Sequence, residues 1–175
     1  MPWPMPPSDP GPVSGPRRLP EPEDFPASGP YSLAAPGPRF GARAIDLSVI
    51  ALPVLIVLAV TAETIEGQLH IDVPLWLIPA AITVGVLYEF VGVVWRAKTP
   101  GKWLLGLRVV RYTDGKAPTP AQALLRALVP WSVLALPLGP FAVAAFLLVY
   151  GTGVGGELHR GVPDQAAGTL VISTR

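Results

Sequence analysis

A membrane-spanning helix is predicted where Arg39-Phe-Gly-Ala-Arg43-Ala-Ile-Asp46 leads directly into the apolar stretch from Leu47 to Ala62. In a helix, Arg39, Arg43 and Asp46 share one face, and Arg43 lies close enough to Asp46 to pair with it. A carboxylate at the centre of a bilayer-spanning helix costs about 2.5–3.5 kcal/mol, and less near the helix end. The polar stripe is therefore either a set of locally neutralised charges or an ion or proton site.

The composition is that of an integral membrane protein. Half of the 175 residues are hydrophobic, 14% are charged and the mean hydropathy is +0.47, which is too apolar for a soluble domain of this length. No cysteine is present, which excludes disulfides and thiol chemistry. The histidines His70 and His159 stand apart, without other ligands at metal spacing. We therefore expect no metal, no cofactor, no catalytic residues and no enzymatic activity.

Residues 1–37 are predicted to form a disordered, cytoplasmic, proline-rich tail. The first 38 residues carry 13 of the 23 prolines and show no hydrophobic periodicity. Such a segment has too little apolar surface to join a helical bundle. We therefore expect it to be dispensable for folding.

Three apolar stretches predict an all-α membrane domain over residues 38–173, with helices at about 40–63, 73–95 and 124–150. The first two stretches are near the ~20 residues that a helix needs to cross about 30 Å of hydrocarbon. The third stretch, from Ala127 to Gly156, exceeds one span, and Pro137-Leu-Gly-Pro140 breaks it near the middle. It is either one kinked span or a hairpin of two short helices that returns to the side it came from.

The connecting segments predict the orientation. The segment between the first two helices is acidic and has no Lys or Arg, whereas residues 96–123 are rich in both. The positive-inside rule places this basic loop and the N-terminus in the cytoplasm. The loop contains an Asp114-Gly115 turn signal, and its apolar residues alternate with cations. This pattern predicts a segment on the membrane surface, with Trp103 inserted and with Lys102, Arg108 and Arg111 among anionic headgroups.

Glu89 is a second carboxylate inside a predicted span. It lies six residues before the interfacial Trp95, about 9 Å from the cytoplasmic boundary at ~1.5 Å per residue. Gly85, Glu89 and Gly92 share a helix face, and small residues at this spacing let another helix approach closely. We therefore expect Glu89 to face protein and to join Asp46 and the two arginines in one cluster.

Taken in order, these residues resemble the RDD family of small bacterial membrane proteins, named for one arginine and two aspartates. The resemblance covers most of residues 38–173 and rests on Arg39 with Ala42-Arg43-Ala-Ile-Asp46, on Tyr88-Glu89, on Thr99-Pro-Gly-Lys102 with Leu105-Gly106-Leu-Arg108, on Ala123-Leu-Leu-Arg126 and on Asp164-Gln-Ala-Ala-Gly168-Thr169. It identifies Asp46 and Asp164 as the two aspartates and Arg39 as the arginine, with Arg43 as a second candidate. Two departures are visible. Arg96-Ala-Lys98 stands where a glycine often precedes Thr-Pro-Gly-Lys, and Val162-Pro163 replaces the usual polar residue before Asp164.

The resemblance implies a multi-pass protein of the bacterial cell (inner) membrane with a cytoplasmic N-terminus, and it favours the hairpin. The family transfers no general function, although some members have been proposed as sodium/proton antiporters. Our leading hypothesis is cation/proton exchange or small-solute transport by a homo-oligomer, through a cluster of Arg39, Arg43, Asp46, Glu89 and Asp164. The alternative is a non-transporting accessory or scaffold protein that binds a partner through its tail or basic loop. We expect no nucleic-acid partner.

Overall fold

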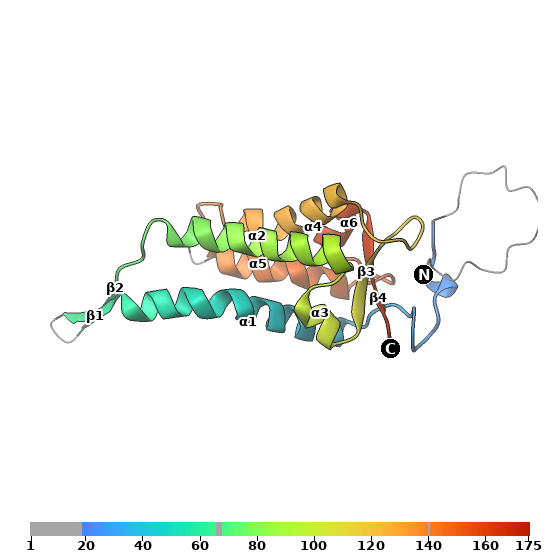
Figure 1. Cartoon of the computed structure of the whole chain (residues 1–175), viewed down its shortest axis with the longest axis horizontal. Coiled ribbons are helices and arrows are strands. Elements are labelled where there is room, and N and C mark those ends of the chain that lie inside the picture. The colour runs from blue at the N-terminus through green and yellow to red at the C-terminus, as the bar shows by residue number, and fades with distance from the viewer. Residues whose placement is uncertain (1–18, 66–67, 140) are drawn as a thin grey trace, which may run out of the picture.

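Two long antiparallel helices form the frame of the computed structural model, which describes residues 19–65, 68–139 and 141–175. They are α1 (Pro36–Val60) and α2 (Leu77–Arg96), and a hairpin of β1 (Ala62–Ile65) and β2 (Gln68–Ile71) joins them at one end (Figure 1). At the other end lie α3 (Pro100–Leu104), β3 (Leu107–Arg111), α6 (Val162–Ala167) and β4 (Thr169–Ser173) (Figure 1). Two single 3-10 turns are formed by Pro22–Asp24 and Thr152–Val154.

Within the described residues, α1 and α2 are the two helices that are long and apolar enough to cross a membrane. Their most apolar 18-residue windows are only 11% and 22% buried, and large side chains such as Leu52, Leu55 and Leu87 are exposed. The core helix of a soluble protein buries its apolar face. An exposed apolar surface of this extent is typical of helices that face lipid.

The third apolar segment is a helical hairpin, which is one of the two alternatives that the sequence left open. α4 (Pro120–Val133) and α5 (Phe141–Gly151) are about 21 and 17 Å long at ~1.5 Å per residue, too short to cross ~30 Å of hydrocarbon. Gly139 lies in the connection with a φ of +55°, and Pro140 lies outside the described residues. The chain therefore returns to the end from which it came (Figure 1).

The prediction that residues 96–123 form a loop is wrong for most of the segment, while its position at the membrane surface stays a prediction. α3 packs against α1, and β3 pairs antiparallel with β4, with Val109 opposite Val171. The domain is therefore mostly helical and not all-α, since it contains two small antiparallel sheets. The Asp114-Gly115 turn is confirmed, because Gly115 has a φ of +66° and its N–H donates to the carbonyl of Arg111.

The predicted disorder of the N-terminal segment is wrong for residues 19–35, whereas residues 1–18 lie outside the described residues. Backbone hydrogen bonds join residues 31–34 to residues 171–173 along the free edge of β4. Phe25 is buried against Val110, Leu170 and Ile172. A proline-rich chain cannot form a helix interior, but it is compatible with an extended sheet edge. We name residues 19–35 the docked segment.

Candidate functional site

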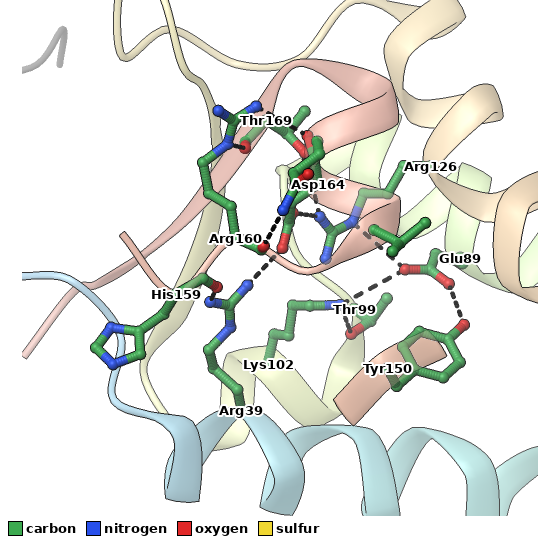
Figure 2. A network of polar contacts seen from close by, with 12 residues as sticks. Arg39, Glu89, Thr99, Lys102, Arg126, Tyr150, His159, Arg160, Asp164 and Thr169 are labelled. Carbon is green, nitrogen blue, oxygen red and sulfur yellow. Dashed lines mark hydrogen bonds and ion pairs between the residues drawn. The ribbon is translucent and has the colours of Figure 1, made fainter. Parts of the chain in front are cut away.

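Seven charged side chains are buried together at the end of the bundle where α1 begins and α2 ends. Figure 2 labels Arg39, Glu89, Lys102, Arg126 and Asp164 among them. Each of them is at most 16% exposed. We name this set the buried charge network; within the described residues it comprises Arg39, Arg43, Lys102, Arg126, Asp46, Glu89 and Asp164. All five predicted site residues belong to it, together with two cations that the sequence analysis did not include.

Asp46 joins α1 to α2 and α3 through three donors. The hydroxyl of Tyr88 donates to Oδ1 at 2.8 Å, the hydroxyl of Thr99 donates to Oδ2 at 2.5 Å, and the backbone N–H of Gly101 donates to Oδ1 at 2.8 Å. Helical spacing allows Arg43 to pair with Asp46, but the carboxylate that Arg43 binds is that of Glu89. Arg43 turns toward α2 instead, because a closer carboxylate partner lies there.

Gly101 allows α3 to approach α1 closely enough for these bonds. A Cβ at this position would lie 2.2 Å from the backbone oxygen of Ala42 and 2.8 Å from Oδ1 of Asp46. Pro100 follows the extended N-cap residue Thr99 and starts the short helix. The residues Thr99-Pro-Gly are therefore a binding loop for the Asp46 carboxylate.

Glu89 accepts hydrogen bonds from two other helices. Arg43 donates to it in a bidentate manner at 2.9 and 3.1 Å, and the hydroxyl of Tyr150 donates at 3.2 Å. Lys102 Nζ lies 3.8 Å and Arg126 Nε 3.5 Å from the same carboxylate (Figure 2). The guanidinium of Arg43 also stacks 3.7 Å above the Tyr150 ring. The prediction that Glu89 faces protein is confirmed, since it is 1% exposed.

The small residues on the same face of α2 have the predicted effect. A Cβ on Gly85 would lie 2.2 Å from the ring of Trp131 on α4, so only glycine permits this contact. A Cβ on Gly92 would lie 3.2 Å from the carbonyl oxygen of Lys98. Both glycines therefore bring neighbouring backbone and ring atoms against the helix face that carries Glu89.

Asp164, on α6, binds the first turn of α1 to α4. It accepts hydrogen bonds from Arg39, at 2.5 Å, from Arg126 and from the hydroxyl of Thr169, at 3.0 Å (Figure 2). Burial raises the pKa of Asp164, but Arg126 and Arg39 outweigh this effect and hold the pKa below its ordinary value. Pro163, a departure from the family pattern, lies in the first turn of α6, where a missing N–H costs nothing.

Two arginine side chains also bind backbone carbonyl oxygens before, within and after α6. Arg160 donates to the carbonyl oxygens of Thr169, at 3.0 Å, and of Asp164, at 3.3 Å. Arg39 donates its second bond to the carbonyl oxygen of His159. The arginine of the first helix is therefore bound to both sides of the turn that precedes Asp164.

Lys102 and Arg126 are the functional candidates that the sequence analysis missed. Lys102 was expected among lipid headgroups, but it is 6% exposed and bonds to the hydroxyl of Thr99 at 3.4 Å. Arg126 was named only as part of a family motif, yet it links Glu89 to Asp164. Both residues stand in the motifs that carry the family resemblance, and this signal could have found them.

A cavity of about 60 Å³ lies beside the network. Its polar lining comes from Arg39, Arg43, Lys102, Arg126, Tyr150 and Asp164, and its apolar lining includes Phe40 and Val154. Burial, followed by the charge of Arg43, lowers the pKa of Lys102 from 10.5 to about 7, although Glu89 opposes this shift. We therefore expect Lys102 to titrate near neutral pH.

The network presents cations rather than carboxylate oxygens to the cavity. Asp46 and Glu89 are occupied by the donors described above, and of the three carboxylates only Asp164 lines the cavity, where two arginines hold it. Among the described residues, no group of three or more His, Cys, Asp and Glu side chains could hold a metal ion. The arrangement suits a proton or an anion better than a metal cation.

Comparison with known proteins gives one match. The model of the RDD family matches residues 33–168, which is most of the chain and includes every member of the buried charge network. No curated protein and no solved structure matches the chain.

Proposed function

The chain belongs to the RDD family, and we propose that it is a multi-pass membrane protein that handles ions by proton-linked transport. The observation that supports this proposal is the position of Lys102. Its ammonium group is buried beside a cavity and faces Glu89 and Asp46 as well as Arg43 and Arg126. A transport site needs a group that changes its charge state, and a pKa of Lys102 lowered to about 7 suits this role near neutral pH.

The roles within the network differ from those expected from the sequence. Asp46 and Glu89 belong to the cluster that was expected to carry the ion or proton, but each is bound by several donors. We assign them to positioning. Asp46 holds α3 against α1, and Glu89 keeps Arg43 and Lys102 in place. Lys102 takes the proton-carrying role, and Asp164 with Arg39 and Arg126 forms the wall of the cavity.

The proposed orientation follows from the position of the basic segment. The N-terminal end of α1, the segment 97–119 and β4 lie at one end of the bundle (Figure 1). The excess of Lys and Arg there favours the cytoplasm of a bacterial cell and places the β1–β2 hairpin outside. In the cysteine-free chain, a cysteine at Gln68 should react with an impermeant thiol reagent in intact cells, and one at Lys116 should not. The reverse pattern would invert the orientation.

Flux through reconstituted liposomes tests the transport proposal. The full chain should dissipate an imposed pH gradient, and the rate of this proton flux should depend on which other ion is present. The substitution Lys102→Gln should abolish the flux. Lys116→Gln is the matched control, because Lys116 is exposed and lies outside the cavity lining. Flux should remain unchanged in the control. Absence of flux in the wild-type protein, or full flux in Lys102→Gln, would reject the proposal.

The alternative is a non-transporting accessory protein, and one observation favours it. Each carboxylate of the network bonds to at least two other elements, as expected of a purely structural clamp. In that case the network only stabilises the fold. A wild-type protein that inserts and folds but gives no flux would support this second candidate.

For the transport function we also propose a homo-oligomer, since α1, α2 and one short hairpin make a narrow bundle.

A further inference from the structure

We propose that the cavity beside Lys102 binds a phosphoryl oxyanion, supplied either as free phosphate or as the phosphate of an anionic lipid headgroup. The inference deepens the proposed function and rests on it, because it names the chemical class of ion that the site takes. Its evidence is the charge balance, the unused donors and the size of the cavity.

The charge balance of the network favours an anion. With Lys102 protonated, the network holds four cations, Arg39, Arg43, Lys102 and Arg126, against three carboxylates. A buried charge without a counterion is unfavourable, because its hydration is lost and nothing replaces it. An anion in the cavity would supply the missing negative charge next to the four cations that line it.

Two of these cations have hydrogen-bonding capacity left. Nζ of Lys102 has three N–H donors, but its hydroxyl contact with Thr99 is 3.4 Å long and Glu89 lies 3.8 Å away. Nε of Arg126 is buried without a hydrogen-bond partner. The two side chains point toward each other from α3 and α4 (Figure 2). Both residues line the cavity, so an acceptor placed there would lie close to both side chains.

The size of the cavity fits a small tetrahedral oxyanion. A buried water needs about 10–15 Å³, so the volume of about 60 Å³ accommodates a group of about four or five non-hydrogen atoms. Arginine guanidiniums recognise phosphate oxygens in a bidentate manner, and lysine adds a point charge. The lining therefore matches a phosphate group in both size and donor type.

The mouth of the cavity permits both sources of the anion. Phe40 and Val154, which line it, are 46% and 51% exposed. They lie near the N-terminal end of α1, the level at which headgroups meet a spanning helix. A lipid phosphate could therefore enter with its acyl chains along these apolar side chains, while a free phosphate would enter from the aqueous side.

Anion binding should be coupled to proton uptake. The charged groups that face Lys102 are Arg43 and Asp46 from α1, Glu89 from α2 and Arg126 from α4. A bound anion adds a negative charge beside the amine and favours the ammonium form. At pH 8, binding should therefore withdraw protons from the buffer, and the heat of binding should change with the ionisation enthalpy of the buffer.

Calorimetry on the full chain in neutral detergent tests the free-phosphate source. Inorganic phosphate is titrated at constant ionic strength, with chloride as the replaced anion. We expect saturable phosphate binding to the wild-type protein. The binding should be at least tenfold weaker in Lys102→Gln and unchanged in Lys116→Gln. If Lys102→Gln does not fold, the wild-type protein still tests phosphate binding. Phosphate, but not chloride, must then raise the thermal midpoint of the wild-type protein.

Nanodiscs test the lipid source. The thermal midpoint of the full chain is compared in phosphatidylglycerol and in the zwitterionic phosphatidylcholine, with Lys102→Gln and Lys116→Gln measured in parallel. Stabilisation by the anionic lipid that depends on Lys102, without binding of free phosphate, identifies the headgroup as the ligand. Binding of neither source overturns the inference.

The two proposals can fail separately. Proton-linked flux without binding of phosphate or anionic lipid would retain the transport function and reject the phosphoryl ligand. Phosphate or headgroup binding that depends on Lys102, without flux, would establish the ligand and reject transport.

Discussion

Replacing Glu89 with glutamine should cost about 3–5 kcal/mol in the free energy of unfolding, the range for breaking a buried ion pair by removing one partner. The amide keeps the shape of the side chain but removes the charge that three cations share. Arg43 lies 2.9 Å from the carboxylate, Arg126 3.5 Å and Lys102 3.8 Å, and Glu89 is 1% exposed. Solvent therefore cannot compensate the charges that remain.

Unfolding of the purified full chain in mixed micelles, followed by circular dichroism, measures this loss. Glu63→Gln is the matched control, because Glu63 lies exposed on β1, and it should change stability by less than about 0.5 kcal/mol. Adding Lys102→Gln to Glu89→Gln removes one uncompensated cation and should recover about 1 kcal/mol or more, as expected for groups in contact. Wild-type stability of Glu89→Gln would refute the reasoning, since the carboxylate would then not balance the buried cations.

Three further changes test other parts of the structure by the same unfolding assay. Gly101→Ala should cost about 3–6 kcal/mol, because its Cβ pushes α3 from α1 and disrupts two hydrogen bonds to the Asp46 carboxylate; an unchanged stability would contradict the close approach. Phe25→Ala should cost about 3 kcal/mol by removing a buried ring, whereas a disordered segment would predict no loss. The pKa of Lys102 is lowered from 10.5 to about 7 in the folded protein, so the unfolded chain binds more protons between these two pH values. The free energy of unfolding should therefore rise with pH across this window, by at most about 1.4 kcal/mol per pH unit. Lys102→Met should remove this rise, and a rise that persists would assign it to another group.

The spanning helices and several residues of the network could be predicted because their signals are local. Apolar length alone indicated α1 and α2, and the glycine spacing on α2 placed Glu89 against protein. The choice of Glu89 rather than Asp46 as the partner of Arg43 could not be predicted from helical spacing. Helical spacing compares Arg43 with Asp46 on the same helix, but it contains no information about Glu89, which is 46 residues away.

The misplaced elements depend on contacts that are distant in the sequence. The sequence of residues 96–123, with its many cations, resembles that of a surface segment. In the structure, β3 pairs with β4, and Val109 and Val110 are buried. The burial of Lys102 follows from the same cause, since α3 is held between α1 and the start of this sheet. The docking of residues 19–35 was not predicted, because a proline-rich composition indicates only low helical propensity and few apolar residues. It contains no information about whether a sheet edge is available to bind the segment.

The ion pair between Arg39 and Asp164 spans 125 residues of the chain, and this separation imposes an order on biosynthesis. Arg39 leaves the ribosome and reaches the insertion machinery long before Asp164 has been translated. During that interval its guanidinium lacks this carboxylate, and we expect it to remain in water or among headgroups. The ion pair that closes this end of the bundle can therefore form only after α6 has been synthesised, and chains that terminate before α6 should be left with an arginine that lacks this partner and become substrates for membrane proteases.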